Sequence, residues 1–161
     1  IDVLVNNASA TSSFGETPST TDMNTATRAL DVTLLGAWRV IQAFLQHLRR
    51  SAHGRVVNVS SGAGSHGDPT FGLTTDNAMG PTYAVAKAAL NALTVCWANE
   101  LEGDGVLVNA VGPGFTATFE GGEGMGARPV AEGAASVVWG CLLPDDGPTG
   151  GFFRDGQPVP W

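Results

Sequence analysis

The sequence predicts an α/β fold in which a parallel sheet carries helices on its faces. Four short apolar segments rich in β-branched residues alternate with three helical runs along the 161 residues. An order of strand and helix repeated in this way favours parallel strands that are joined by right-handed crossovers. Because 43% of the residues are hydrophobic, the chain can bury the core of one domain.

The four strand segments are apolar enough to be buried on both faces of the sheet. The long helices between them begin at an aspartate or a proline, residues that suit a helix N-terminus. A glycine-rich stretch, residues 120–129, follows the third strand and is expected to form a mobile flap. The expected strands are residues 2–6, 55–60, 105–111 and 150–155, and the expected helices are 22–50, 81–101 and 129–143.

Charge and composition disfavour several classes of function. The net charge is −7 and the seven arginines are dispersed apart from Arg49-Arg50, so no nucleic-acid surface is expected. The sequence has no 18-residue apolar run and no signal peptide, which predicts a cytoplasmic protein without a membrane partner. Cys96 and Cys141 lie in apolar helical stretches, where we expect small core residues, and two cysteines make no metal site.

The only tyrosine and the only lysine of the chain, Tyr83 and Lys87, stand four residues apart in a helical run. Residues at this spacing are neighbours on one helix face. A nearby ammonium group is expected to lower the pKa of the phenol, so that it can exchange protons near neutral pH. The alternative is an ordinary pair on a helix surface without chemistry.

Polar residues gather where the predicted strands end. The segments Asn6-Asn7-Ala8-Ser9, Ser60-Ser61-Gly62 and Pro113-Gly114 follow the first three strands, and Tyr83 opens the next helix. Ligands of parallel sheets bind at this carboxyl edge. A hydroxyl donor, a phenol and a cation would converge there and polarise a carbonyl group. Periodicity alone does not choose between Ser60 and Ser61.

The segments "DVLVNNAS", "GRVVNVSSGAG", "YAVAK" and "VNAVGPGFTAT" resemble, in this order, the short-chain dehydrogenase/reductase family. The resemblance implies a Rossmann-type doubly wound sheet and a nicotinamide cofactor. It implies that Tyr83 is the general acid or base, that Lys87 also holds the cofactor ribose, and that Ser61 binds the substrate oxygen. It further implies that the cofactor is lined by Asn7, Ala8, Pro113, Gly114, Thr116 and Thr118.

Three departures from the family pattern affect this interpretation. Thr33 stands where a catalytic asparagine is usual, and its backbone carbonyl is expected to keep the contact with a water. Ser9 replaces a glycine, so the turn after the first strand is expected to differ slightly. The family's glycine-rich phosphate loop is absent, so residues 1–161 are interpreted as the C-terminal portion of one domain. Gly62–Gly67 fits G-x-G-x-x-G but runs into Asp68-Pro69 instead of a helix, so we reject it as a substitute. Alone, the chain is expected to bind cofactor weakly and to be inactive.

The tail, residues 132–161, resembles the carbonyl reductase branch of the family, which implies NADP as cofactor, with NAD as the alternative, and an aldehyde or ketone substrate. A non-catalytic sensor is the alternative function, and a serine hydrolase is disfavoured because Val59 replaces the first glycine of its motif.

The sequence leaves the oligomeric state open: subunits could pair through the long helices, or the protein could be a monomer. We expect solvated histidines at His47, His53 and His66, sheet-end hydrogen bonds at Asn6 and Asn58, and either an apolar pocket or core packing for Phe71, Phe115, Phe119, Met125 and Trp161.

Overall fold

The structure, a computed structural model, describes residues 1–11, 13, 15–75 and 79–161. Within them, the strands form one sheet in the order β1-β2-β3-β4-β5. The first four, β1 (Val3–Asn6), β2 (Arg55–Val59), β3 (Leu107–Val111) and β4 (Phe152–Arg154), are parallel, which confirms the predicted α/β class. The sequence did not predict β5 (Gln157–Pro158), which pairs antiparallel with β4, because two residues are too few to give a pattern.

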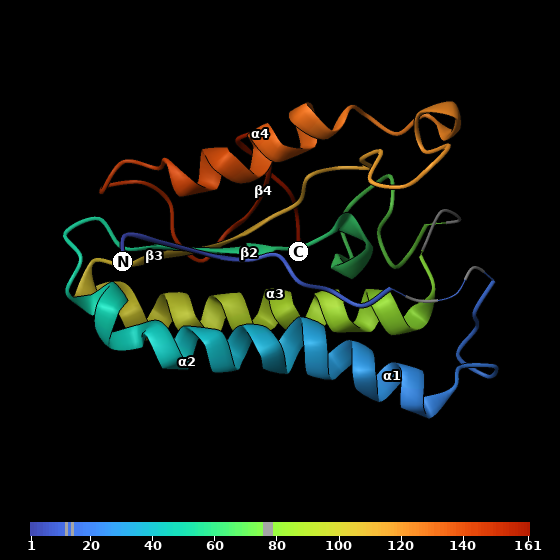
Figure 1. The fold of residues 1–161 in the computed structure, drawn as a ribbon, viewed down its shortest axis with the longest axis horizontal. Coiled ribbons are helices and arrows are strands. Elements are labelled where there is room, and N and C mark those ends of the chain that lie inside the picture. The colour runs from blue at the N-terminus through green and yellow to red at the C-terminus, as the bar shows by residue number, and fades with distance from the viewer. Residues whose placement is uncertain (12, 14, 76–78) are drawn as a thin grey trace.

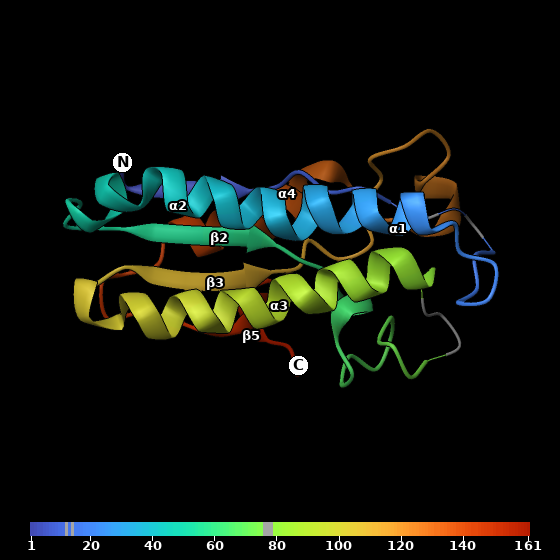
Figure 2. The ribbon, with the colours of Figure 1, turned by 90° about the horizontal axis from the view of Figure 1, so that it is seen from below.

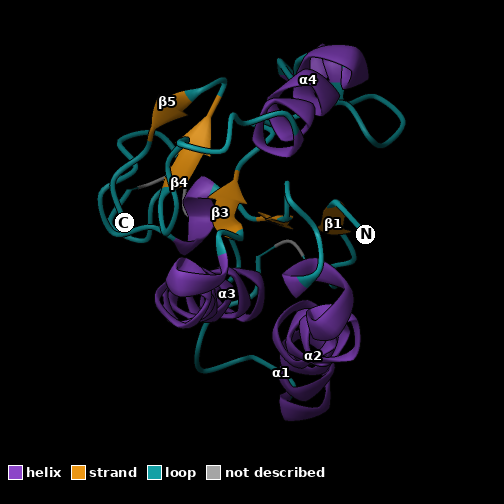
Figure 3. Cartoon of the chain, turned by 90° about the vertical axis from the view of Figure 1, so that its left-hand side faces the viewer, coloured by secondary structure: helices purple, strands orange, loops and turns teal. Residues whose placement is uncertain are grey.

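Helices cover both faces of this sheet. The run expected at 22–50 contains α1 (Met23–Leu30), a π-helical turn η1 (Asp31–Leu35) and α2 (Gly36–Arg49). The other two long helices are α3 (Pro81–Leu101) and α4 (Val130–Cys141). Figure 1 and the end-on view of Figure 3 show α1, α2 and α3 on one side of the strands and α4 on the other. This is the layered arrangement that alternating strands and helices predict.

The hydrophobic core lies between the sheet and the layer of α2 and α3. Ile41 and Leu48 of α2 and Leu90 and Leu101 of α3 are at most 1% exposed and pack on Val108 and its neighbours in the strands. Across the strands, the Asn6 amide donates to Asn58 Oδ1 at 2.8 Å, and the Asn58 amide donates to Thr94 Oγ1 at 2.9 Å. The predicted sheet-end role of the two asparagines is confirmed.

The first strand departs from the expectation that all strands are buried on both faces. Residues of β2 and β3 are buried throughout, but Val3 and Val5 of β1 are 38% and 40% exposed. Val138 of α4 and Leu142, directly after that helix, are 49% and 75% exposed. β1 is therefore an open edge in the described part of the chain, with its own apolar side chains partly exposed.

The exposure of the histidines and of Cys96 tests the roles expected for them. His47, His53 and His66 are exposed as predicted, although His53 Nδ1 also lies 2.9 Å from Asp145 Oδ1. Cys96 is exposed, so its assignment to the core was wrong, because this side of α3 faces away from the sheet. The described residues contain no cluster suited to a metal ion. None of the helices described has the length and apolar character that crossing a bilayer requires.

Candidate active site

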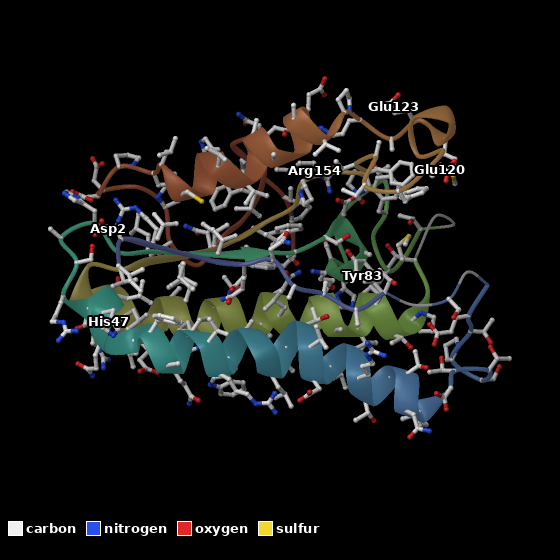
Figure 4. The ribbon with its side chains drawn as sticks, in the orientation of Figure 1. Asp2, His47, Tyr83, Glu120, Glu123 and Arg154 are labelled. Carbon is white, nitrogen blue, oxygen red and sulfur yellow. The ribbon has the colours of Figure 1, made fainter. Side chains whose placement is uncertain are left out.

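Tyr83 lies at the end of the molecule to which the parallel strands point. Figure 2 shows the arrowheads of β2 and β3 directed toward the start of α3, and Figure 4 places Tyr83 at that end, with Asp2 and His47 at the other. Pro81 opens α3 because a proline lacks only a hydrogen bond that the first helical turn does not make. The first turn of α3 therefore brings Tyr83 to the carboxyl edge of the sheet.

Ser61, Tyr83 and Lys87 converge at this edge. The Ser61 hydroxyl lies close enough to the Tyr83 phenol to lower the pKa of that phenol. Lys87, one turn further along α3, is 2% exposed and donates from Nζ to the carbonyl oxygen of Val59 at 2.7 Å. Its Nζ lies 5.5 Å from the centroid of the Tyr83 ring. The spacing in the sequence thus places the cation beside the phenol, as predicted.

The pKa of Tyr83 shifts in the direction opposite to the prediction, and the pKa of Lys87 is shifted as well. Burial raises the pKa of the Tyr83 phenol above 10.0, and the hydrogen bond from Ser61 offsets this only in part. The predicted lowering by Lys87 was therefore wrong, because the ammonium is bonded to Val59 instead of the phenol oxygen. Burial also lowers the pKa of Lys87 from 10.5 to about 8.

The two adjacent serines, between which periodicity does not choose, have different partners in the structure. Ser60 is 2% exposed and donates to Asn91 Oδ1 at 2.5 Å, while the Asn91 amide donates to the carbonyl oxygen of Gly64 at 3.2 Å. Ser60 therefore fastens the turn after β2 to α3. Ser61 is half-buried, faces Tyr83 and accepts from the Ala63 N–H at 3.2 Å. Of the two hydroxyls, that of Ser60 is occupied by Asn91, and that of Ser61 influences the pKa of the phenol.

Thr33 and Ser9, two residues that depart from the family pattern, contact each other. Thr33 is 1% exposed within the π-helical turn η1, and its Oγ1 lies 3.1 Å from Ser9 Oγ and accepts from the Ala10 N–H at 3.2 Å. Ser9 does not adopt a positive φ angle, so it tolerates a side chain. The threonine side chain thus anchors the segment that follows β1, and the π-helical turn packs against α3 beside the site.

Asn7 and Ala8, predicted to line the cofactor, are exposed at the end of β1. They border a groove of about 480 Å³ between β1 and the start of α2. The groove does not include Tyr83 or Ser61 among its lining residues. Asp31, Arg39 and Val40 form part of its opposite wall.

The segment after β3 forms a wall beside the site. Gly114 has a φ of +73°, a conformation that favours glycine, and the Thr116 hydroxyl donates to the carbonyl oxygens of Pro113 and Gly114, at 3.1 Å each. From α4, the Ser136 hydroxyl donates to the Gly112 carbonyl oxygen at 3.1 Å. We call residues 112–116 the β3 wall. Thr118 is exposed beyond it.

Three phenylalanines form a chain of rings, and the middle one, Phe115, belongs to the β3 wall. The ring centroids of Phe71 and Phe115 are 6.3 Å apart, and those of Phe115 and Phe119 are 6.2 Å apart. None of the three is buried, so core packing is excluded for them. Met125 is 62% exposed, and Trp161 stacks on Phe152. The apolar lining stays a prediction for the three phenylalanines.

The glycines of residues 62–67 serve close packing, in agreement with the rejection of a phosphate-binding motif. After a short 3-10 turn, η2 (Gly62–Gly64), the chain continues as a loop. A Cβ on Gly64 would overlap the backbone of Lys87 and Ala88. Gly64 therefore lets the turn that carries Ser61 approach α3 closely.

The glycine-rich stretch at 120–129 is exposed in its middle but anchored at its end. Glu120, Glu123 and the short 3-10 turn η4 (Glu123–Met125) project at the same end of the molecule as Tyr83 (Figure 4). The Arg128 N–H donates to the Phe115 carbonyl oxygen at 2.8 Å, and Arg128 Nη1 donates to Asp155 Oδ2 at 2.9 Å. Hydrogen bonds and an ion pair thus hold the C-terminal end of the stretch, and the mobile flap stays a prediction.

Sequence analysis missed two charged residues behind the site, Asp68 and Arg154. They form a salt bridge although they are 86 residues apart in the chain. No motif spacing connects them, and only the position of Asp68 just past the Gly62–Gly67 stretch could have drawn attention to it.

Comparison with known proteins relates this chain to one family. The family model described as short chain dehydrogenase matches residues 1–123. The 3-oxoacyl-[acyl-carrier-protein] reductase FabG of Thermotoga maritima is 37% identical over 119 residues, which are 73% of this chain and 44% of that protein. The short-chain dehydrogenase anuI of Penicillium roqueforti is 32% identical over 161 residues, covering 91% of this chain and 63% of that protein. The chain thus spans about half the length of these relatives.

Solved structures share the fold. Carbonyl reductase Sniffer of Drosophila melanogaster superposes with a TM-score of 0.83 at 23% identity, and the NADPH-bound carbonyl reductase from chicken fatty liver superposes with 0.82 at 23% identity. Both comparisons cover 100% of this chain and 66% of the other. A 3-oxoacyl-[acyl-carrier protein] reductase with bound NAD from Brucella melitensis has a TM-score of 0.78 at 26% identity, over 96% of this chain and 61% of that one.

Proposed function

We propose, since this chain belongs to the short-chain dehydrogenase family of oxidoreductases, that it interconverts an aldehyde or ketone and the corresponding alcohol at Ser61, Tyr83 and Lys87. The observation that carries the proposal is the proximity of the three side chains: the Ser61 hydroxyl acts on the Tyr83 phenol, and Lys87 Nζ lies 5.5 Å from the centroid of the Tyr83 ring. Two neighbouring hydroxyl donors are what a carbonyl oxygen needs when it gains negative charge.

In the direction of reduction, the two hydroxyls bind the carbonyl oxygen of the substrate. A reduced nicotinamide, when bound, supplies the hydride for the carbonyl carbon. Tyr83 gives its phenol proton to the oxygen, which becomes the alcohol, and Ser61 holds that oxygen by a hydrogen bond. A proton from solvent then replaces the one transferred, and Lys87, with Nζ 5.5 Å from the centroid of the ring, holds the side of the site next to the phenol. In the direction of oxidation, Tyr83 accepts the proton.

The residues at the carboxyl edge fit the nicotinamide half of a dinucleotide. The β3 wall carries a glycine at positive φ, Gly114, and the Lys87 amine donates to the Val59 carbonyl oxygen at the same edge of the sheet. We propose NADP as the cofactor, with NAD as the alternative, because solved structures of the same fold contain NADPH or NAD. Asn7, Ala8, Thr116 and Thr118 would complete its binding site.

The phosphate half of the cofactor needs a glycine-rich loop at a helix N-terminus, and we propose that a further segment supplies it. The open edge of β1 and the exposed Val3 and Val5 support this proposal, because another parallel strand would pair there and cover them. Residues 1–161 would then be the C-terminal portion of a single domain.

The isolated chain is expected to bind NADPH and NADH weakly, without saturation below roughly 1 mM. The reason is that the glycine-rich phosphate loop is proposed to lie in the further segment. Isothermal titration measures this, with reduced nicotinamide mononucleotide as the matched ligand. We expect all three ligands to bind with similar affinity. A micromolar dissociation constant for NADPH alone would contradict the proposal that the phosphate site lies in another segment.

The adjacent serines offer a matched test of the proposed chemistry in a version that carries the phosphate-binding segment. Ser61→Ala is expected to lower kcat/KM about 100-fold, because it removes one donor to the substrate oxygen. Ser60→Ala is expected to cost about 1–3 kcal/mol of unfolding free energy, because the buried Asn91 oxygen loses its donor, and to leave kcat close to that of the wild type. Consumption of reduced cofactor with a panel of aldehydes and ketones measures activity. Equal kcat/KM for the wild type and Ser61→Ala would exclude the assigned role.

The proposed substrate is a small carbonyl compound or alcohol with an apolar, often aromatic, group. The chain of Phe71, Phe115 and Phe119 supports this, because the rings are partly exposed next to the β3 wall and offer stacking surfaces. Relatives of the chain include a 3-oxoacyl-[acyl-carrier-protein] reductase and a fluoren-9-ol dehydrogenase from Terrabacter. The aromatic chain favours the flat, apolar class of substrate.

A further inference from the structure

The salt bridge between Asp68 and Arg154 lies behind the turn that carries Ser61. Asp68 belongs to the loop after η2, and its side chain is fully buried; Arg154 ends β4, and its side chain is 24% exposed. A buried carboxylate is unfavourable unless it is paired and hydrogen-bonded. A pair of this kind, formed between distant parts of the chain, holds those parts in one arrangement.

On the loop side, Asp68 organises the backbone that leads to Phe71. Its Oδ1 accepts from the Thr70 N–H at 2.8 Å and from the Phe71 N–H at 3.0 Å. Burial alone would raise the pKa of Asp68, but these backbone hydrogen bonds and Arg154 bring it below 3.8, so the group is charged. Asp68 therefore determines where the Phe71 ring meets Phe115.

On the sheet side, the pair packs against two glycines that flank the site. A Cβ on Gly62, directly after Ser61, would overlap the Asp68 carboxylate and lie 2.8 Å from Arg154 Nη2. A Cβ on Gly112 would lie 3.9 Å from Arg154 Nε. The two side chains thus fill the space between the Ser61 turn and the β3 wall. In the described residues, Arg154 Nε has no hydrogen-bond partner, so Asp68 is the main anchor of the guanidinium.

The C-terminal segment supports the same loop from a second point. The Ser65 hydroxyl donates to the Pro160 carbonyl oxygen at 2.5 Å and accepts from the Asp68 N–H at 2.9 Å. The Gly67 N–H donates to the Trp161 carbonyl oxygen at 3.0 Å. The C-terminal segment thus holds the loop at Ser65 and Gly67. The salt bridge holds the loop at Asp68 and determines how far it lies from the Ser61 turn.

We propose that Asp68 and Arg154 are a positioning pair, which fixes the Ser61 hydroxyl and the Phe71 side of the substrate pocket relative to the β3 wall. The inference rests on the proposed reductase function for its kinetic consequence only. Neither residue touches the reacting atoms. Their effect passes through Gly62 to Ser61 and through the loop to Phe71.

The test uses Asp68→Asn, which keeps an acceptor for the Thr70 and Phe71 N–H groups and removes the charge that holds Arg154. In the version that carries the phosphate-binding segment, kcat is expected to fall about tenfold and the KM for the carbonyl substrate to rise several-fold, with the KM for the cofactor unchanged. The double variant Asp68→Asn/Arg154→Met is expected to lose no more than Asp68→Asn alone, because the two residues act as a unit. Arg154→Lys, which keeps the charge but not the planar fork, is expected to give an intermediate loss.

Asp145→Asn is the matched control, because it also removes the carboxylate partner of a buried arginine, Arg55, but at the other end of the strands. It is expected to lower stability and to leave both kinetic constants unchanged. Hydrogen exchange of the amides in residues 62–75 provides a readout that needs no activity, and faster exchange in Asp68→Asn is expected there.

Two results would overturn the inference. In the active enzyme, a kcat/KM for Asp68→Asn within twofold of the wild type would show that the pair has no positioning role. If the wild type reduces no carbonyl compound, the proposed function fails, and hydrogen exchange then decides the inference alone. Unchanged exchange at residues 62–75 would refute it, and faster exchange confined to these residues would support it.

Discussion

Replacing Tyr83 with phenylalanine is expected to lower kcat about 1,000-fold in a version of the protein that carries the phosphate-binding segment. The substitution removes the only group at the site that can give a proton to the substrate oxygen, because Ser61 keeps its own proton and Lys87 is bonded to the Val59 carbonyl. The ring remains, so its contact with the Lys87 ammonium remains as well. Steady-state kinetics and cofactor titration on both proteins give the measurement.

The same pair of proteins separates an enzyme from a non-catalytic sensor of the same fold. Loss of activity with unchanged cofactor affinity in Tyr83→Phe supports catalysis. If neither protein turns over any carbonyl compound while both bind the cofactor, the sensor is the correct interpretation. Activity in Tyr83→Phe equal to that of the wild type would falsify the role of the phenol.

The layered fold was predictable because strands buried between helices leave a simple signature. The β-branched runs of β2 and β3 are buried at every position, and α3 begins and ends at the residues that the proline and the apolar run indicate. The exposure of β1 does not follow from the strand's own residues, since Val3 and Val5 have the composition of a buried strand, and it depends on what lies beside the sheet. A sequence pattern describes a segment, whereas burial depends on its neighbours.

The site was predictable where one element carries its residues and not where distant elements meet. The spacing of Tyr83 and Lys87 on one helix gave their proximity directly. The choice of Ser61 over Ser60 follows from which hydroxyl Asn91 occupies, a contact across 31 residues. Likewise, the partnership of Ser9 with Thr33 and the pKa of Tyr83 depend on packing that no local pattern records.

Lys87 gives a prediction in which stability and activity change in opposite directions. Its pKa is 10.5 in the unfolded reference and about 8 in the folded chain, because burial disfavours the charged form. Below pH 8 both states carry the proton and the folded state bears the full cost of the buried charge, roughly 3 kcal/mol. As pH rises from about 8 to 10.5, the folded state loses its proton first and this cost disappears. Unfolding free energy from Lys87 therefore rises with pH across that window.

Lys87→Met is accordingly expected to raise the unfolding free energy by about 2 kcal/mol at pH 7, after about 1 kcal/mol is lost at the Val59 carbonyl, which no longer has its donor. The stability difference between variant and wild type should shrink between pH 8 and 10, as urea unfolding at several pH values would show. Because burial raises the pKa values of Tyr83 and Cys141 in both proteins, comparing the two largely cancels their effect. Arg49→Met, which removes a partly exposed cation, is the control and should keep the pH dependence of the wild type. If Lys87→Met is less stable than the wild type at pH 7, the lysine serves the fold. If it is more stable and has lost its reductase activity, the buried ammonium is kept for the chemistry at Tyr83, at the expense of stability.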